Sequence, residues 1–209
     1  MTSQERTTPP APQYAERSYR SPAALVGGVL LLLLALWLGG DALIRGTGQT
    51  RLTAVFALLL VVPLVIAFTL RPLVRAGEDR LTIRNPFRTI VLPWDAVEDL
   101  RASFSTEVFA GGGKYQLWAV PVSLRQRKKA SRQAMRGAAS TRPRFGPNAD
   151  AGGPVPRAMA DQTLDELREI KERAARREGA QGEPVVRWAY EVIAPSVVGA
   201  VGLAVMIVL

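Results

Sequence analysis

Three uncharged apolar stretches constrain the fold of this chain more than any other feature of its sequence. They cover residues 23–40, 52–70 and 192–209 and are 18, 19 and 18 residues long. An α-helix needs about 20 apolar residues to cross roughly 30 Å of hydrocarbon, and a soluble domain seldom has even one such stretch. We therefore expect an integral membrane protein with a transmembrane hairpin at 23–71 and a third transmembrane segment at 188–209.

The first apolar stretch is expected to be a permanent anchor. It is longer than the apolar core of a typical signal peptide, has no small-x-small cleavage site before Asp41, and is followed at once by a second span. The leader before it, residues 1–22, contains four prolines among Ser, Thr and Gln and shows no apolar periodicity. This composition predicts a disordered leader.

The arginine distribution predicts the topology. Five arginines lie between residues 71 and 88, directly after the second span, whereas the connection 41–51 holds two. Because Lys and Arg near span ends are retained on the cytoplasmic side, the leader and the soluble part are expected in the cytoplasm of a multi-pass cell membrane protein, with Leu209 outside. The third stretch is the least hydrophobic, so an interfacial position for it stays open as an alternative.

The residue types present limit the chemistry of the chain. It has no cysteine and no histidine, which excludes disulfides and thiolate catalysis and removes the commonest general base and metal ligand. Carboxylates occur in the soluble part at Glu78, Asp79, Asp95, Glu98 and Asp99. They flank expected turns without the paired spacing of acid–base catalysis. We expect no enzyme and assign no catalytic, cofactor-binding or metal-binding residue.

The soluble part opens with strand signals. Residues 80–84 alternate between polar and apolar, Asn85-Pro86 supplies a turn, and 88–92 are again extended, which predicts a hairpin. Segment 97–104 fits strand or helix, 106–109 is β-prone, and 115–122 predicts a third clear strand. The glycines at 111–113 precede a strand, not a helix N-terminus, so we expect a turn and not a phosphate loop. Four to five antiparallel strands are expected.

These segments carry a family resemblance. Two spans followed by Gly77–Thr89 (GEDRLTIRNPFRT), then Leu92–Glu98 (LPWDAVE) and Leu117–Val120 (LWAV), resemble the bacterial pleckstrin-homology (PH)-like family that includes the mycobacterial low molecular weight protein antigen of actinobacteria. The resemblance covers about residues 20–122. It implies a small, strongly bent antiparallel barrel closed at one end by a C-terminal helix. Trp94 and Trp118 are interpreted as core residues, with ligand contact as the alternative.

The closing helix has its own signal. Thr163-Leu164-Asp165-Glu166 fits a capping box, and apolar residues recur after it at helical spacing to about Glu178. The fold class expected is therefore a membrane α-helical anchor with a small α+β PH-like domain at 74–180. Beyond it, Trp188 and Tyr190 fit an aromatic belt at the membrane interface, and Glu191 is expected to be interfacial.

A basic insertion at about 125–157 departs from the family pattern. No Asp or Glu occurs from 108 through 149. Near an anionic leaflet each basic residue contributes about 1 kcal/mol of attraction. Residues assigned to possible anionic-lipid contact are Arg125, Arg127, Lys128, Lys129, Arg132 and Arg136. A solvated loop is an equal alternative, the prolines favour disorder, and nucleic acid is not an expected partner, because only Phe145 offers a base-stacking surface.

Fold resemblance alone does not transfer a ligand. Eukaryotic members that hold inositol phosphates use basic residues around a longer first hairpin loop, whereas the turn here is Asn85-Pro86-Phe87. The sequence favours a non-enzymatic, membrane-anchored interaction module at the inner leaflet, with the lipid bilayer and an unidentified protein as partners. The alternative is an accessory subunit of a transport or cell-envelope complex that acts mainly through its transmembrane helices. Gly199 and Gly202 are spaced too closely for a Gly-x-x-x-Gly motif and support it weakly.

Overall fold

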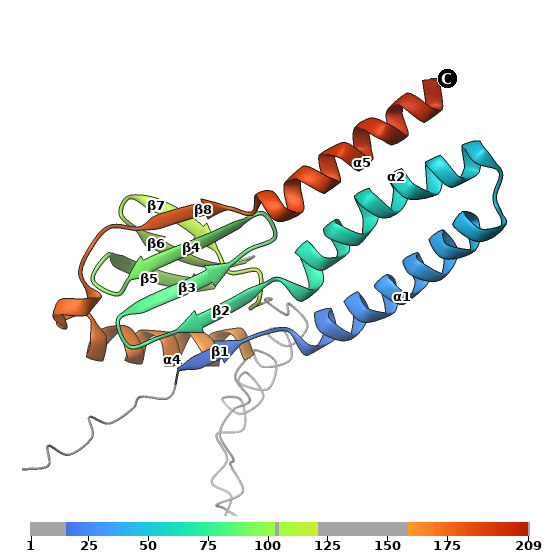
Figure 1. The fold of residues 1–209 in the computed structure, drawn as a ribbon. Helices are drawn as coiled ribbons and strands as arrows, with labels where there is room; N and C mark the ends of the chain where they lie inside the picture. Colours follow the sequence, from blue (N-terminus) through green and yellow to red (C-terminus); the bar gives the residue numbers. More distant parts are fainter. Residues whose placement is uncertain (1–15, 103–104, 121–158, 209) are drawn as a thin grey trace, which may run out of the picture.

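The computed structural model describes residues 16–102, 105–120 and 159–208 of the 209-residue chain. A β-rich domain lies at one end of three long helices (Figure 1). The elements are β1 (Arg17–Tyr19), α1 (Pro22–Arg45), α2 (Gly48–Val65), a π-helical turn (Ile66–Leu70), β2 (Leu73–Ala76), β3 (Arg80–Arg84), β4 (Arg88–Pro93), β5 (Val97–Ala102), β6 (Thr106–Ala110), β7 (Gly113–Gln116), α4 (Met159–Ala174), a 3-10 turn (Glu178–Ala180), β8 (Val185–Trp188) and α5 (Tyr190–Val208).

All three predicted spans are long apolar helices. Pro22–Arg45, Gly48–Leu70 and Tyr190–Val208 are each long and apolar enough to cross a membrane. The middle helix packs against both of the others. Pro63 lies inside it and the π-helical turn follows shortly after, so the helix accommodates the proline and continues to Leu70.

Small residues of α5 are used within the chain. A Cβ atom on Gly199 would lie 2.5 Å from the backbone nitrogen of Leu60, and one on Gly202 would lie 2.1 Å from the Phe56 ring. Gly199 and Gly202 therefore allow α5 to approach α2 closely, although their spacing differs from the Gly-x-x-x-Gly pattern.

The strands form two antiparallel sheets. The larger has the order β1-β2-β3-β4-β8 and the smaller β5-β6-β7. The predicted hairpin is confirmed as β3 and β4, with Arg84 opposite Thr89. The ambiguous segment is strand β5. The predicted glycine turn is also confirmed, because Gly111 and Gly112 have φ values of 54° and 69° between β6 and β7. Strand β7 is shorter than predicted, since residues 117–120 already form a turn.

The structure also differs from the sequence-based expectations in its edge strands, in the closure of the barrel and in the bounds of α4. Strands β1 and β8 were not predicted; β1 lies within the leader that was expected to be disordered, of which residues 1–15 fall outside the described residues. The implied barrel is not closed, because the two sheets share no ladder within the described strands. Helix α4 begins at Met159, so Thr163 is an internal helical residue and not the N-cap, and the helix ends at Ala174.

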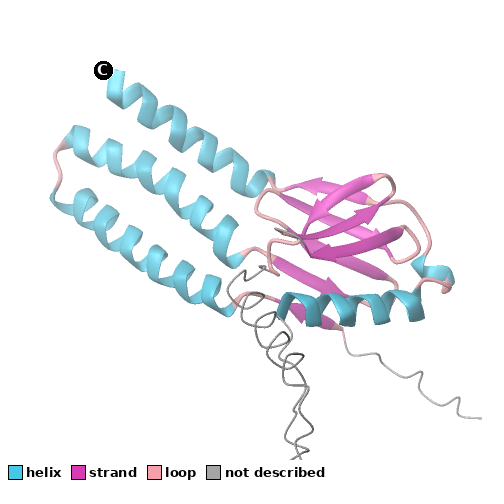
Figure 2. Cartoon of the chain, turned by 180° about the vertical axis from the view of Figure 1, so that it is seen from behind, coloured by secondary structure: helices cyan, strands magenta, loops and turns pink. Residues whose placement is uncertain are grey.

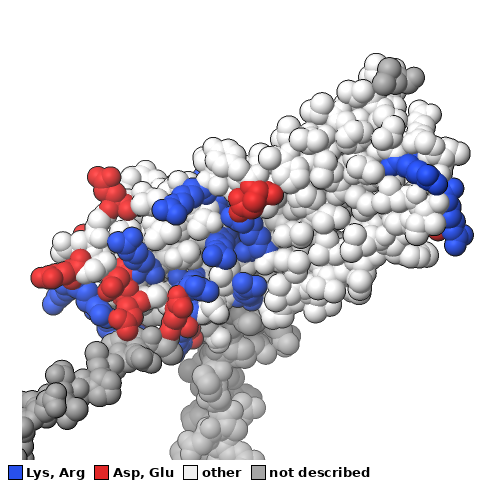
Figure 3. Space-filling view, in the orientation of Figure 1, with Lys and Arg blue, Asp and Glu red and all other residues white. Residues whose placement is uncertain are grey.

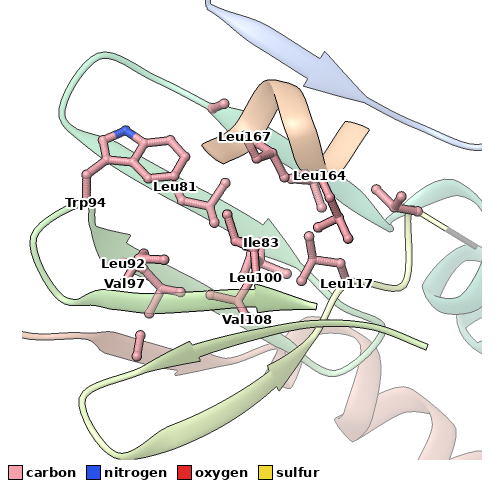
Figure 4. Packing of buried hydrophobic residues seen from close by; sticks show 14 of the residues in the cluster. Leu81, Ile83, Leu92, Trp94, Val97, Leu100, Val108, Leu117, Leu164 and Leu167 are labelled. Atoms are coloured by element: carbon pink, nitrogen blue, oxygen red, sulfur yellow. The ribbon is translucent and has the colours of Figure 1, made fainter. Parts of the chain in front are cut away.

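The core lies between the sheets and α4. Figure 4 shows Trp94, Leu81 and Leu100 pointing into the same space as Leu164 and Leu167 of α4. Helix α4 lies along one side of the domain (Figure 2). There Tyr19 Oη donates to Glu166 Oε2 at 2.6 Å, and Arg168 Nη2 donates to the Leu100 carbonyl oxygen at 2.6 Å. The helix thus joins β1 of one sheet to β5 of the other.

The two tryptophans that were predicted as core residues differ. Trp94 is fully buried, and its indole N–H donates to the Gly77 carbonyl oxygen at 3.0 Å, which confirms the prediction. Trp118 is 45% exposed, so the core prediction for it is wrong. It lies in the turn after β7 and packs against Phe68 of the second span, with ring centroids 5.5 Å apart. Trp118 therefore contacts the second apolar helix and not the core of the domain.

Candidate membrane-interface site

Three strands of the larger sheet continue directly into the three apolar helices. At most two residues separate β1 from α1, the π-helical turn from β2, and β8 from α5. All three connections lie at the same end of the sheet (Figure 1). We call this end, residues 20–22, 68–73, 84–89 and 187–191 together with Trp118, which packs on Phe68, the membrane-facing end. Connections this short hold the sheet against the ends of the helices.

Aromatic residues gather at the membrane-facing end. Phe68 contacts Phe87 edge-on, with ring centroids 5.3 Å apart, and also contacts Trp118. Trp188 and Tyr190 are 56% and 69% exposed. Trp and Tyr prefer the membrane–water interface, where one part of the ring is in apolar surroundings and the polar atom meets water. The aromatic belt stays a prediction, and a position at the membrane interface would give a physical reason for the exposure of Trp118.

Asn85 fastens the β3–β4 turn to the second sheet. Asn85 is only 3% exposed, and its Nδ2 donates to the Gln116 carbonyl oxygen at 2.8 Å. Oδ1 accepts from the Trp118 backbone N–H at 3.4 Å. An amide side chain can donate and accept at once, so Asn satisfies both groups. Sequence reasoning identified the turn but missed this bridge, because its partners lie about 30 residues away.

Arg71 joins the second span, the β3–β4 hairpin and the third span. Its Nε donates to the Asn85 carbonyl oxygen and its Nη2 to Thr89 Oγ1, both at 3.2 Å. Its Nη1 pairs with Glu191 Oε1 at 2.6 Å. The Arg71 side chain is only 18% exposed. Glu191 therefore lies in the first turn of α5 as a partner of Arg71, and its position at a membrane interface stays a prediction.

Positive charge also gathers at the membrane-facing end. Its residues include one carboxylate, Glu191, and five arginines: Arg20, Arg71, Arg84, Arg88 and Arg187. Figure 3 shows basic surface where the domain meets the helices, whereas most of the helical surface in this view carries no charge until the far connection. The electrostatic character of this end thus suits contact with anionic groups.

The opposite end of the domain has a different arrangement. Because β2 precedes β3, the first hairpin turn is 77–79 and not the Asn85–Phe87 turn considered from the sequence. Glu78 and Asp79 in this turn pair with Arg177, at 3.1 and 3.3 Å. The first hairpin turn therefore carries two carboxylates, which gives no basis for inositol-phosphate binding there.

The residues assigned to anionic-lipid contact lie outside the described residues. Arg125, Arg127, Lys128, Lys129, Arg132 and Arg136 all belong to this group, so their contact with lipid stays a prediction. Four of the five carboxylates considered for catalysis have side-chain partners typical of turns and strands: Glu78 and Asp79 pair with Arg177, Glu98 accepts from the Gly112 N–H, and Asp99 pairs with Arg101. Within residues 16–102, 105–120 and 159–208, no three carboxylates form a group able to hold a metal ion.

Comparison with known proteins identifies the type of domain. Residues 71–145, about a third of the chain, match a family model described as "Bacterial PH domain". Neither the curated proteins nor the solved structures gave a match. The matched segment begins at Arg71 and contains β2 to β7, and PH domains are interaction modules. The chain thus combines a region similar to bacterial PH domains with three helices that are long and apolar enough to cross a membrane.

Proposed function

We propose that this protein is a non-enzymatic, membrane-anchored interaction module whose PH-like domain, strands β1–β8 with α4, lies at the inner leaflet of the cell membrane. The observation that carries the proposal is the direct continuation of three strands of one sheet into three apolar helices. A long linker would let a domain sample many orientations. Connections of one or two residues instead present a constant surface of the domain to partners.

The arginines support the inner-leaflet side of the proposal. Five of them lie at the membrane-facing end, whereas the α1–α2 connection at the other end of the hairpin holds Arg45 and Arg51 together with Asp41. Arg45 is paired with Asp41 at 2.9 Å, which offsets one of these charges. Positive residues close to span ends favour the cytoplasmic side.

The accessory-subunit alternative has less support. Gly199 and Gly202, the small residues that favoured a helix–helix contact with another protein, pack against α2 of the same chain. In contrast, within the described residues β8 is an edge strand that pairs only with β4, and Val185 and Val186 are each 40% exposed. Exposed strand edges can accept an added strand from a partner. We therefore place the main interaction surface on the domain.

Reporter fusions test the orientation. A reporter active only outside the cytoplasm is fused after residue 48, after residue 148 and at residue 209, with a cytoplasmically active reporter at the same three positions. The proposal expects external activity at 48 and 209 and cytoplasmic activity at 148. External activity at 148 would overturn the inner-leaflet assignment.

Site-specific photo-cross-linking tests which surface binds partners. The cross-linker is placed in the domain at Lys114 or Val185, and in the spans at Leu33 or Val201, all of which are exposed in the structure. Protein adducts formed from the domain positions support the interaction module. Adducts formed from the span positions alone would support the accessory-subunit alternative.

A further inference from the structure

One row of residues crosses the outer face of the larger sheet at its membrane-facing end. The strand register places Leu73 opposite Arg84, Arg84 opposite Thr89, and Thr89 opposite Arg187. Arg84 alternates along β3 with the buried Ile83, so its side chain points away from the core. Directly paired residues share a face of the sheet, and therefore Thr89 and Arg187 point outward as well.

The two arginines of this row, Arg84 and Arg187, are both exposed. Within the described residues, neither Arg84 nor Arg187 forms an ion pair or a side-chain hydrogen bond, and both are exposed. Adjacent strands are about 4.8 Å apart, so the backbones of these two arginines, which flank β4, are about 10 Å apart. Long side chains at this separation can converge on one anion above Thr89.

Thr89 supplies a further donor at the centre of the row. Its Oγ1 accepts a hydrogen bond from Arg71 Nη2 at 3.2 Å. A hydroxyl that accepts in this way keeps its own hydrogen available for donation. The charge of Arg71 is offset by Glu191 at 2.6 Å, whereas those of Arg84 and Arg187 are not offset within the described residues. Among the described residues, the row thus presents one hydroxyl and two guanidinium groups that no carboxylate pairs with.

The position of the row indicates the source of the anion. Arg187 is followed immediately by the exposed Trp188 and then by α5, and Arg84 is followed by the turn whose Phe87 packs on Phe68 of the second span. Aromatic residues of this kind mark the depth of lipid headgroups. An anion that reaches the row from the bilayer needs no path through the protein.

We propose that Arg84, Thr89 and Arg187 bind the phosphate of an anionic phospholipid headgroup on the outer face of the larger sheet. The planar guanidinium groups match the geometry of phosphate oxygens, and the threonine hydroxyl donates a third hydrogen bond. None of its three residues belongs to the basic insertion or to the first hairpin turn. It deepens the proposed function and rests on the domain lying at the membrane surface.

Lipid binding to the full-length protein tests the proposal. The purified chain in a mild zwitterionic detergent is titrated with short-chain phosphatidylglycerol, with phosphatidylcholine of the same chain length, and with inorganic phosphate, and bound lipid is counted by native mass spectrometry. The site variant is Arg84→Gln with Arg187→Gln. The matched control, Arg80→Gln with Arg176→Gln, also removes two exposed charges; Arg80 lies on the same face of β3, at its other end. Both retain the basic insertion.

The site variant is expected to bind phosphatidylglycerol about tenfold more weakly than the parent, and the control less than about twofold more weakly. Thr89→Val, which changes no charge, is expected to weaken binding about threefold, an effect that general electrostatic attraction would not produce. Equal losses in site variant and control, or no loss in the site variant, would overturn the site. Displacement of the lipid by inorganic phosphate at an equal concentration would overturn the lipid assignment.

Two features keep the result interpretable. The melting temperature of each variant without lipid is measured first, and Arg84→Gln and Arg187→Gln are tested singly if the double variant unfolds, each with an expected loss of about threefold. The reporter and cross-linking results concern orientation and protein partners and do not depend on lipid affinity. A failure of the lipid site and a failure of the proposed function therefore give different patterns of results.

Discussion

The two ends of the PH-like domain use the same residue types in opposite ways. At the end away from the helices, Trp94 is fully buried and Arg177 is paired with Glu78 and Asp79. At the membrane-facing end, Trp118 is 45% exposed and Arg84 has no ion pair within the described residues. Tryptophan and arginine thus serve internal packing and pairing at the far end. At the membrane-facing end Trp118 and Arg84 are exposed, and Arg71 is the arginine that pairs internally.

The surroundings of each end explain the difference. Among the described residues, no apolar helix begins at the far end, and Trp94 packs in the core while Arg177 makes exposed ion pairs of modest strength with the first hairpin turn. The membrane-facing end lies where the apolar helices begin, and headgroups and interfacial water there can satisfy arginine and aromatic side chains. Exposed aromatic rings at this end, and arginines that are unpaired within the described residues, such as Trp118 and Arg84, are therefore expected to make contacts outside the chain.

The largest expected effect comes from the two tryptophans. Trp94→Ala should lower the free energy of unfolding of the domain by about 3–5 kcal/mol, because it leaves a large cavity in the core. Trp118→Ala should cost only about 1 kcal/mol. Protease resistance of the full-length protein in detergent measures both, since a 74–180 fragment would lack β1 and β8. Equal losses of stability in the two variants would show that Trp118 is as important to the core as Trp94, contrary to the difference between the two ends.

Asn85 tests whether the membrane-facing end has a buried polar bridge of its own. Asn85→Ala should lower the free energy of unfolding by about 1–3 kcal/mol, because the Gln116 carbonyl and the Trp118 N–H lose their partner in a buried setting. Gln116→Ala is the control, since its side chain is exposed and its backbone carbonyl remains. Thermal unfolding followed by circular dichroism compares the stability of the two variants. An Asn85→Ala variant as stable as the Gln116→Ala control would contradict a structural role for the Asn85 bridge.

The two paired arginines sharpen the comparison further. Arg71→Gln should destabilise the protein by about 1–2 kcal/mol, because a side chain only 18% exposed loses contacts to Asn85, Thr89 and Glu191. Arg177→Gln should cost less than about 1 kcal/mol, as expected of a more exposed pair. Denaturant titrations of the two variants in the same detergent measure the difference, and the reverse order would show that the far end depends more on its charge pairs.

The smallest effect concerns Tyr19, which joins β1 to α4 between the two ends. Burial, followed by the hydrogen bond to Glu166, raises the pKa of Tyr19 from 10.0 to about 12. A raised pKa in the folded state means that its contribution to stability is complete below pH 10 and is lost as the pH rises towards 12. The melting temperature of the parent protein should fall over this pH window, and the melting temperature of the Tyr19→Phe variant should fall less. Parallel curves for the two proteins would contradict this assignment.

The Tyr19–Glu166 hydrogen bond also affects stability in acid, where stability is lost as the pH falls. The hydrogen bond from Tyr19 lowers the pKa of Glu166 below its ordinary value of 4.5, and Arg17 adds to this effect. A lowered pKa means that the stabilisation is present above pH 4.5 and is lost as the pH falls through the folded-state value. Glu166→Gln should therefore show a weaker acid dependence than the parent in the same melting series.

Local patterns were sufficient to predict the elements that depend on neighbours in sequence. The three spans follow from uninterrupted apolarity, and the β3–β4 hairpin follows from alternation around Asn85-Pro86. The turn at Gly111 follows from the backbone freedom of glycine. The capping box at Thr163 shows the limit of such signals, because the helix had already begun at Met159.

Contacts between distant segments decided the rest. Strands β1 and β8 have three and four residues, too few for a readable pattern, and they exist because β2 and β4 offer unpaired backbone groups at the sheet edges. The apolar stretches of the sequence by themselves determined that the described part of this protein has three helices long and apolar enough to cross a membrane. Only strand register placed Arg187 in one row with Arg84, which is about 100 residues earlier, because pairing between remote strands leaves no periodic trace in the sequence.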